Sequence, residues 1–568
     1  MEPSLEEVRR IAAAGDCRRI PVKREILSDS LTTIQAIAKL RAASRHCFLL
    51  ESAEPDEHWG RYTFLGFHPK LEVTCTNGLL RIRESATGRA LDEAASEVET
   101  AAAFEGALET RDAFEGAPES ASETGTASER VPESASETET SSEGASETES
   151  EVTSAARPGI APGAESVIEM RVDHPGDALR EILADHKSAI VEGMPPFTGG
   201  LVGYFSYDYL KYAEPSLRYE DDLEDFLDVD LMLFDDVIAF DSYRQKIMII
   251  GGVDADDVDE SYARAEVRLE EIEKLLLEGP RADFPPLELD ESLEPRFSRE
   301  RYMGMVESAI DHIKEGDIFQ VVLSNPRRAK AEGSLFDAYR LLRCENPSPY
   351  MFYFVSDDVE LAGSSPETLV RLQDGTLFTY PLAGTRPRSE DSEEDARRER
   401  ELLEDEKELA EHNMLVDLGR TDLGRISEIG TVRVDDYMQV LKFSKVMHIG
   451  STVSSTIASD KDALDAVDSI LPAGTLSGAP KIRACQIIHE LEDDNRGIYG
   501  GAVGYLDFTG GMDLCIAIRL AYKKNGVVCI QSGAGIVADS DPSTEFDECV
   551  NKAKAVIEAV ERSQGGVA

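Results

Sequence analysis

Two pairs of glutamates with helical spacing are the first residues of this chain that could carry out chemistry. Glu408 and Glu411 lie three positions apart in DEKELAEH, and Glu545 and Glu548 repeat this spacing in STEFDECV. Residues separated by three positions share one face of a helix, and carboxylate oxygens are ligands that Mg²⁺ prefers. Two such pairs facing each other would form a magnesium site. Each pair alone is also typical of a solvent-exposed helix face, so both interpretations stay open at this point.

Glycine-rich turns are the second group of candidates: PLAGTRP, PAGTLSGAPK, YGGAVGY and SGAGIVAD. Glycine lets backbone N–H groups approach an anion closely, and PAGTLSGAPK precedes a predicted helix whose amino-terminal end favours negative charge. These turns suggest a small anionic substrate. Residues Gly533 to Ala538 also fit the dinucleotide fingerprint G-x-G-x-x-A. In that fingerprint the glycines open the helix directly, whereas here the helix starts only at Pro542, which argues against a dinucleotide.

Three polar residues are isolated inside apolar segments: Gln320 in IFQVVLS, His448 in VMHIG and Arg519 in IAIRLA. A buried His or Arg needs a polar partner. The three residues are therefore either core groups whose hydrogen bonds are satisfied or residues that line a pocket, and their positions alone do not decide between these roles.

The elements that must position these residues alternate between helices and strands. Periodicity predicts helices over Ser298–Glu315, Asp391–Leu418, Pro480–Leu491 and Pro542–Val560. Strands are predicted at IFQVVLS, YMFYFVS, AVGYLDF, LCIAIRLAY and VVCIQSG. This pattern predicts an α+β (layered α/β) fold with mixed, largely antiparallel sheets flanked by helices.

An acidic insertion interrupts the amino-terminal half. Residues 84–166 consist mostly of Glu, Ala, Ser, Thr and Gly and carry a net charge of −16. Such a segment buries too little apolar surface to offset its ordering entropy, so we expect it to be disordered, as a tolerated surface insertion or, alternatively, an interaction tail. Strand-like stretches flank it, and we expect one sheet to run across it. A Pro-rich connection then predicts this division: an amino-terminal domain over 1–83 and 167–290, the insertion over 84–166, and a second domain over 291–568.

Composition narrows the classes of function. The chain has 59 Lys and Arg against 111 Asp and Glu, a net charge of −52, which argues against a nucleic-acid partner. No apolar run has the roughly 20 residues of a membrane span, and MEPSLEEVRR does not resemble a signal peptide, so we expect a soluble cytoplasmic protein without membrane contact. Acidity sustained along the chain suggests a salt-adapted organism. The eight scattered cysteines are predicted to be reduced structural thiols.

Several sequence blocks together resemble the chorismate-utilising enzymes. In order, they are GDIFQVVLS, SPETLVRL, PLAGTRPR, DEKELAEHNMLVDLGRTDLGRI, VMHIGSTV, PAGTLSGAPK, RGIYGGAVGY, IAIRLAY and GAGIVADSDPSTEFDECVNKA. They cover the whole carboxy-terminal half, and LLES, RYTFLG and GYFSYD add weaker support before it. Within that superfamily the chain most resembles the anthranilate synthase component I family. The resemblance implies that 291–568 is a chorismate-binding catalytic domain and that the amino-terminal domain is regulatory.

The resemblance also implies the roles of individual residues. In the family, chorismate loses its C4 hydroxyl, ammonia adds at C2 and pyruvate is eliminated. Mg²⁺ would be held by Glu408, Glu411, Glu545 and Glu548 and would bind the ring carboxylate. Glu367 in SPET matches the general acid, whose pKa we expect nearby carboxylates and burial to raise. Further matching positions are His448 for the elimination, Thr475 and Gln320 in the catalytic pocket, Arg519 and Tyr499 for the enolpyruvyl carboxylate, and Gly384, Thr385, Gly533, Ala534, Gly535 and Lys552 around the ring carboxylate.

Two positions distinguish this chain from its relatives. Enzymes of the superfamily that add water carry a lysine at the position of Gln320, and Gln cannot deprotonate water near neutral pH. Aminodeoxychorismate synthases carry a lysine nucleophile where this chain has Ala383. Both differences favour anthranilate synthesis, the first step of tryptophan biosynthesis. The alternatives are an aminodeoxychorismate synthase of the folate branch and a regulatory amino-acid-binding protein with a dead site.

Two partners follow from the resemblance. No Cys lies in a nucleophile elbow with a downstream His, so ammonia is expected to come from a separate glutamine amidotransferase subunit. The family's feedback site for tryptophan uses the LLES and NPSPYM blocks. In this chain it would comprise Leu50, Glu51, Ser52, Asn346, Pro347, Pro349, Tyr350 and Met351.

Overall fold

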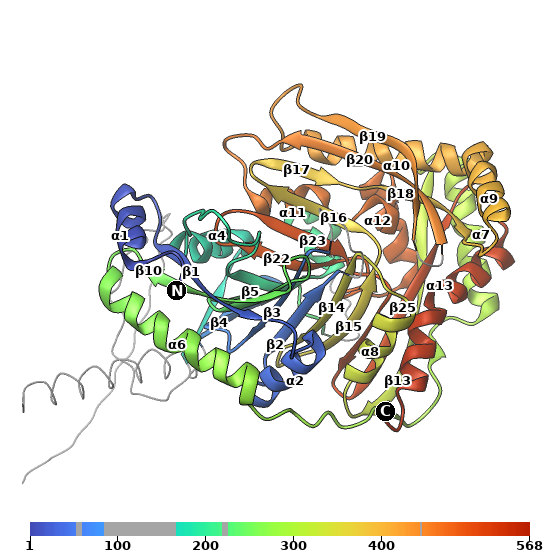
Figure 1. Cartoon of the computed structure of the whole chain (residues 1–568). Coiled ribbons are helices and arrows are strands. Elements are labelled where there is room, and N and C mark those ends of the chain that lie inside the picture. Colours follow the sequence, from blue (N-terminus) through green and yellow to red (C-terminus); the bar gives the residue numbers. More distant parts are fainter. Residues whose placement is uncertain (53–59, 85–165, 219–224, 444–445, 568) are drawn as a thin grey trace, which may run out of the picture. The chain divides into compact units, whose positions relative to one another are not determined.

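The computed structural model describes residues 1–52, 60–84, 166–218, 225–443 and 446–567. Nearly all of the acidic insertion, with our expectation that it is disordered, lies outside these residues. The two stretches Met1–Asp92 and Glu165–Ala568 group into one compact unit, and Figure 1 shows its sheets and helices. No helix in the described ranges is long and apolar enough to cross a membrane.

The first sheet contains 13 described strands, and every paired neighbour in it is antiparallel. Its strands follow the order β1 (Arg19–Leu27), β10 (Lys246–Asp254), β9 (Val237–Asp241), β3 (Tyr62–Phe67), β2 (Cys47–Glu51), β14 (Tyr350–Val355), β15 (Glu360–Ser365), β24 (Leu520–Lys524), β25 (Val527–Ile536), β13 (Gln320–Glu332) and β11 (Glu288–Leu289). Two short strands, β12 (Glu294–Pro295) and β21 (Gly478–Ala479), also pair with β13.

The second sheet contains 12 described strands and is also antiparallel. Its order is β18 (Leu382–Pro387), β20 (Val446–Thr456), β17 (Thr376–Thr379), β16 (Thr368–Gln373), β23 (Met512–Ile516), β22 (Ala502–Asp507), β7 (Gly200–Phe205), β8 (Val229–Phe234), β4 (Leu71–Thr76), β5 (Leu79–Glu84) and β6 (Val167–Arg171), with β19 (Arg433–Lys442) paired to β20. Strands β5 and β6 flank the insertion and pair with each other, which confirms that one sheet runs across it.

An aromatic core packs between the two sheets, and helices cover their outer faces. Phe48 of the first sheet and Phe234 of the second meet with ring centroids 4.7 Å apart. Against the first sheet lie α1 (Leu5–Ala14), α2 (Thr33–Ala43), α6 (Val258–Glu278), α7 (Arg299–Glu315), α8 (Phe336–Glu345), α12 (Lys481–Glu492) and α13 (Pro542–Arg562). Against the second lie α4 (Pro175–Asp185), α5 (Leu210–Ala213), α9 (Ser392–Glu404), α10 (Glu406–Gly424) and α11 (Ala463–Ile470). The predicted fold class is confirmed.

Two predicted elements are wrong in detail. The helix predicted over Asp391–Leu418 is two helices, because the Asp405 carboxylate accepts hydrogen bonds from the backbone N–H groups of Lys407 and Glu408 and caps a new helix, α10. The strand predicted at LCIAIRLAY is also divided. Arg519 adopts a left-handed φ of +53° there, so β23 ends in the second sheet and β24 begins in the first.

Both sheets contain strands from both sides of residue 290, and apart from the short β11 the two sets form separate blocks that meet at one strand pair in each sheet. β14 pairs with β2 in the first sheet, and β22 pairs with β7 in the second. The proposed division into 1–83, 84–166, 167–290 and 291–568 remains a prediction from the sequence.

Candidate active site

The chain crosses between the two sheets twice at one place, and each crossing carries a predicted site residue. Glu367 lies between β15 and β16, and Arg519 lies between β23 and β24. Backbone hydrogen bonds join the crossings: Ile516 N–H donates to the Glu367 carbonyl at 3.0 Å, and Ser364 N–H donates to the Arg519 carbonyl at 3.1 Å. The sheet topology therefore brings together two residues that are 152 positions apart in the sequence.

The Glu367 carboxyl is held by one hydroxyl. Thr475 Oγ1 lies 3.1 Å from Glu367 Oε1 and donates to it. Burial raises the pKa of Glu367 to about 7, while the Thr475 hydrogen bond and the charge of Lys552 act in the opposite direction. The expected raised pKa is present. The expected cause was partly wrong, because burial produces the shift without a contribution from a neighbouring carboxylate.

His448 on β20 faces the PLAGT turn on β18. Its Nδ1 lies 2.8 Å from the Gly384 carbonyl oxygen and 3.1 Å from Thr385 Oγ1. A carbonyl only accepts hydrogen bonds, so Nδ1 carries the proton and Nε2 is left as the basic nitrogen. Burial, together with the charge of Arg519, lowers the pKa of His448, so the ring is neutral at pH 7. A neutral imidazole of this tautomer can accept a proton at Nε2.

Gly384 keeps this turn close to the predicted metal ligands. It has a φ of +65°, and a Cβ there would lie 2.8 Å from Leu402 Cδ1 and 3.1 Å from Glu408 Oε2. A larger residue would be strained and would press on Glu408.

Arg519 and Tyr499 form the cationic side of the site. Burial lowers the pKa of Arg519, and the electrostatic effect of the nearby Tyr499 hydroxyl raises it again in part. Within the described ranges, the guanidinium has no hydrogen bond or ion pair. A mostly buried guanidinium that still carries its charge and has no protein acceptor is suited to bind a substrate carboxylate.

The SGAG segment, expected to be a turn, lies within strand β25 beside Gln320. In the β13–β25 register, Gly533, Ala534 and Gly535 lie across from Ser324, Leu323 and Val322. A Cβ on Gly535 would lie 2.9 Å from Gln320 Nε2, and one on Gly533 would lie 3.1 Å from the Tyr499 hydroxyl. A side chain at Gly535 would displace Gln320, and one at Gly533 would meet the Leu323 carbonyl oxygen at 2.5 Å as well as Tyr499.

The four predicted metal ligands influence one another's charge. Glu411 has a raised pKa because of burial and the charges of Glu408 and Glu548. Glu545 has a raised pKa because of burial and the charge of Glu548, despite a hydrogen bond from Ser540. The charge of Glu548 on α13 therefore acts on Glu411 on α10, and the metal site that the sequence suggested for these four residues stays a prediction.

This set of carboxylates fits a divalent cation. Glu545 Oε2 is buried and has no hydrogen-bond partner among the described residues. Carboxylates that repel one another and retain an unpaired buried oxygen are stabilised by a cation between them. In no set of three of these glutamates do the carboxylate oxygens lie within 4.8 Å of one another. Among the described residues, His312, Glu315 and Asp317 form a set that meets this distance.

Two charged residues of the site, Arg386 and Lys407, were not predicted. Arg386, two positions after Gly384, donates to Glu408 Oε1 at 3.0 Å and to Asp405 Oδ2 at 2.8 Å. The charge of Lys407 lowers the pKa of Glu411 and Glu545. Lys552, predicted to bind substrate, is paired with Glu548 Oε1 at 2.7 Å. Arg386 and Lys407 lie inside the motifs PLAGTRPR and DEKELAEH, so their position in these blocks was the available signal.

A second, larger cavity of about 1140 Å³ lies away from this site. It is lined by most of the residues predicted to bind tryptophan: Leu50, Glu51, Ser52, Pro349, Tyr350 and Met351. Asn346 and Pro347 are not among its lining residues. Strands β2 and β14 bring the two blocks together, with Met351 opposite Glu51.

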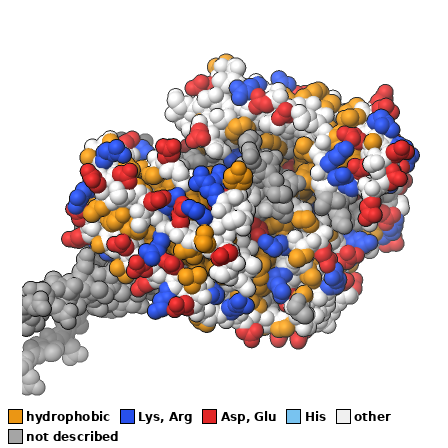
Figure 2. Space-filling model, viewed as in Figure 1, with side chains coloured by type: hydrophobic (Ala, Val, Ile, Leu, Met, Phe, Trp, Pro, Cys, Tyr) orange, Lys and Arg blue, Asp and Glu red, His pale blue; other side chains and the backbone are white. Residues whose placement is uncertain are grey.

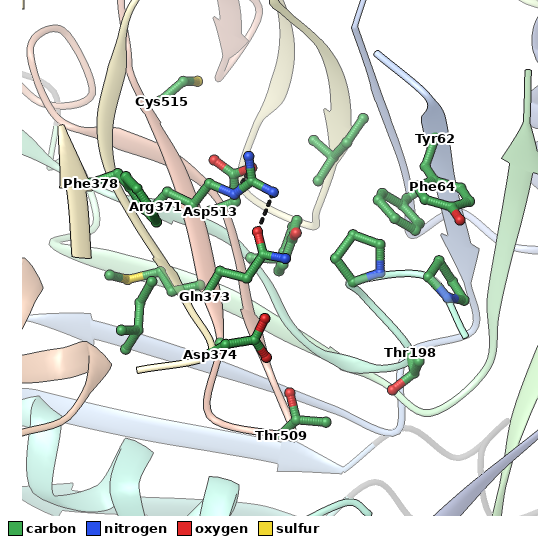
Figure 3. A pocket seen from close by; sticks show the side chains of 18 of the residues that line it. Tyr62, Phe64, Thr198, Arg371, Gln373, Asp374, Phe378, Thr509, Asp513 and Cys515 are labelled. Carbon is green, nitrogen blue, oxygen red and sulfur yellow. Dashed lines mark hydrogen bonds and ion pairs between the residues drawn. The ribbon is translucent and has the colours of Figure 1, made fainter. Parts of the chain in front are cut away.

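Both apolar and charged groups line this larger cavity. Figure 3 shows Tyr62 and Phe64 on one side of the space, with Arg371, Gln373 and Asp374 on the other. Arg371 donates to Gln373 Oε1 at 2.6 Å. The cavity could therefore hold a ligand with an aromatic part and charged groups.

The chain is similar to known proteins over nearly its whole length. A family model described as chorismate binding enzyme matches residues 145–558. Anthranilate synthase component 1 of Acetivibrio thermocellus is 36% identical over 569 residues, and that of Pseudomonas aeruginosa is 38% identical over 573 residues; each match covers 99% of both chains. The crystal structure of anthranilate synthase component I from Streptococcus pneumoniae TIGR4 matches with a TM-score of 0.65 at 33% identity, covering 89% of this chain and 93% of that one.

Proposed function

The chain belongs to the chorismate-binding enzymes and, within them, to the anthranilate synthase component 1 family, and we propose on this basis that it makes anthranilate from chorismate and ammonia. The observation that carries the proposal is that Glu367, a carboxyl whose pKa is about 7, lies on a crossing whose backbone is hydrogen bonded to that of Arg519, and that burial and the charge of this same Arg519 lower the pKa of His448. The aminodeoxychorismate alternative is not favoured, because the full-length relatives are named for anthranilate synthesis.

In the proposed reaction, Glu367 donates its proton to the C4 hydroxyl of chorismate, which leaves as water. Ammonia forms the new bond at C2. Elimination of the enolpyruvyl group as pyruvate then restores the aromatic ring, and His448 would take the ring proton at Nε2, since Nδ1 is bound to the Gly384 carbonyl. The products are anthranilate, pyruvate and water, which balances the atoms of chorismate and ammonia.

The charges of the site match a dianionic substrate. Arg519 and Tyr499 would hold the enolpyruvyl carboxylate, and Lys552 and the backbone of Gly384 and Gly535 would lie around the ring carboxylate. Glu408, Glu411, Glu545 and Glu548 would hold Mg²⁺. When bound, the cation would supply positive charge for the ring carboxylate, which otherwise faces four acids.

The two positions at which relatives carry a lysine nucleophile or base offer no amine in this chain. Ala383 is buried on β18, and Gln320 is an amide whose Nε2 lies 3.5 Å from Glu411 Oε1. Neither can form a covalent adduct or deprotonate water, so free ammonia must attack. We propose that a glutamine amidotransferase subunit supplies it and that this chain is the large subunit of a two-component enzyme.

We also propose that tryptophan binds in the 1140 Å³ cavity as a feedback inhibitor. The support is that residues of the LLES and NPSPYM blocks, distant in sequence, line one cavity that offers both aromatic and charged groups. Calorimetric titration with tryptophan tests this, with phenylalanine as the control ligand. Absence of binding would exclude the inhibitor site while leaving the catalytic proposal intact.

The catalytic proposal is tested by the product formed from chorismate, Mg²⁺ and ammonium. Anthranilate is fluorescent, so its formation can be followed directly. Glutamine should replace ammonium only when an amidotransferase subunit is added. Formation of aminodeoxychorismate, or no turnover with ammonium, would contradict the proposal.

A further inference from the structure

Arg496 and Glu492 form a buried ion pair behind the wall of the candidate active site. Their side chains are 1% and 5% exposed. Arg496 Nη2 lies 2.6 Å from Glu492 Oε1, and Arg496 Nε lies 2.9 Å from Glu492 Oε2, so the guanidinium and the carboxylate meet in a two-point contact. Arg496 begins the RGIYGGAVGY block, and no role for it follows from the sequence.

The rest of the guanidinium is bound to two separate backbone segments. Nη1 donates to the Leu476 carbonyl at 2.6 Å, and Nη2 donates to the Val322 carbonyl at 2.7 Å. Glu492 in turn accepts from the Ser324 backbone N–H at 2.7 Å and from its hydroxyl at 3.0 Å. One ion pair therefore connects the PAGT turn to strand β13.

Each connected segment carries a residue of the site. Leu476 follows Thr475, whose hydroxyl holds Glu367. Val322 lies two positions after Gln320 and pairs with Gly535. Arg496 also lies over the ring of Tyr499, with its guanidinium carbon 5.7 Å from the ring centroid.

We propose that Arg496 is a positioning residue that sets Thr475, and through it Glu367, relative to Gln320 and Tyr499. The inference rests on the proposed function, because it assigns Glu367 as the acid. A buried ion pair in itself is weak support for stability, since desolvation offsets its attraction. The pair matters here because its guanidinium also donates hydrogen bonds to two backbone carbonyls. The planar, five-donor guanidinium of arginine can make these bonds and the contact to Glu492 at the same time, whereas the ammonium of lysine cannot.

Arg496→Lys tests the proposal because it keeps the charge and removes the fork. We expect kcat/KM for chorismate to fall by about tenfold or more, since small misplacements of catalytic groups have large effects on rate. The Thr475 hydrogen bond lowers the pKa of Glu367, so loosening the turn should also move the basic limb of the pH profile to higher pH. Thr475→Val, which removes that hydrogen bond directly, should move the limb in the same direction.

Arg19→Lys is the matched control, because Arg19 also forms a buried ion pair, with Asp235 at 2.6 Å, outside the site. Arg19→Lys should lower the melting temperature without moving the basic limb of the pH profile. If Arg496→Lys does not fold, Glu492→Gln weakens the same contact and should move the basic limb of the pH profile to higher pH. An unchanged limb and unchanged kcat/KM in the folded variant would overturn the positioning role. An inactive wild-type enzyme would instead overturn the proposed function.

Discussion

The hydroxyl of Thr475 donates a hydrogen bond of 3.1 Å to Glu367 Oε1, and this bond opposes the effect of burial on the same carboxyl. Burial favours the neutral acid, whereas a donor to the carboxylate favours the charged form. Their balance sets the pKa of Glu367 at about 7. The group is therefore half-protonated at neutral pH, where an acid catalyst works best.

We expect Glu367→Gln to lower kcat by about 100- to 10,000-fold, because an amide cannot donate the proton that the hydroxyl needs on leaving. For the wild type, kcat/KM expressed per free ammonia should fall as pH rises above about 7, the pKa of Glu367. The fluorescence assay measures both. A Gln variant with wild-type turnover would exclude Glu367 as the acid.

Stability should depend on pH through the same residue. The folded-state pKa of Glu367 is raised from 4.5 to about 7, so its favourable contribution is complete below pH 4.5 and is lost as pH rises through 7. Glu367→Gln has no such loss. We expect its free energy of unfolding, relative to the wild type, to increase by about 2 to 3 kcal/mol between pH 4.5 and pH 8.

Denaturant unfolding at several pH values measures this difference. Glu558→Gln, an exposed change on α13, serves as the control and should show no comparable trend. A relative stability of Glu367→Gln that is constant across the range would show that the carboxyl is not shifted.

Removal of one carboxylate should weaken the proposed metal site. We expect Glu411→Gln and Glu548→Gln to bind Mg²⁺ at least tenfold more weakly and to lose activity while remaining folded, because fewer acidic oxygens attract the cation. Calorimetry with MgCl₂ gives the binding change independently of turnover, with Glu558→Gln again as the control. Full activity in EDTA, or unchanged Mg²⁺ affinity in both variants, would exclude these ligands.

A base at position 320 should change the product. Gln320→Lys places an amine beside Glu411, where it can activate water to compete with ammonia. We expect isochorismate or salicylate to appear beside anthranilate when the products are separated by mass spectrometry. The exposed Gln439→Lys should give anthranilate alone. The interpretation of Gln320 fails if the Lys variant stays active and forms only anthranilate.

Salt should stabilise this protein. Acidic and basic side chains are interspersed on the face shown in Figure 2, yet the chain carries a net charge of −52, of which −16 falls in residues 84–166. Counterions screen this self-repulsion, so we expect the melting temperature to rise between about 0.01 and 1 M KCl. Calorimetric scans at fixed pH measure the effect. A melting temperature independent of KCl would contradict adaptation to salt.

Local patterns predicted most of the helices and strands, because hydrophobic periodicity and helix capping depend on residues that are close in sequence. Ser298 and Asp541 cap α7 and α13 close to where the spacing placed those helices. The break at Asp405 was missed because both helical patterns continue through it in phase. The break at Arg519 was missed because a strand that changes sheets keeps its apolar sequence, and only the backbone dihedral reveals the crossing.

For the site, the motifs identified the residues but not the forces on them. The spacing of the glutamates indicated shared faces, yet the mutual effect of α10 and α13 on Glu411 and Glu545 depends on their packing. The cause of the raised pKa of Glu367 could not be predicted, because burial is a property of the whole fold. Arg496 illustrates the same limit, since the two carbonyls that it binds, those of Val322 and Leu476, are 154 positions apart in sequence.

The strand pairs at which the two halves of the chain meet in each sheet also let each half protect the other from aggregation. In the first sheet β2 covers one side of β14, and in the second β7 covers one side of β22. Without the amino-terminal half, Tyr350–Val355 and Ala502–Asp507 would each present a row of unpaired N–H and C=O groups along an apolar strand. Such edges recruit other chains into aggregates. Pairing between the two halves thus protects against misassembly, because each half of the chain covers a strand edge that the other would leave open.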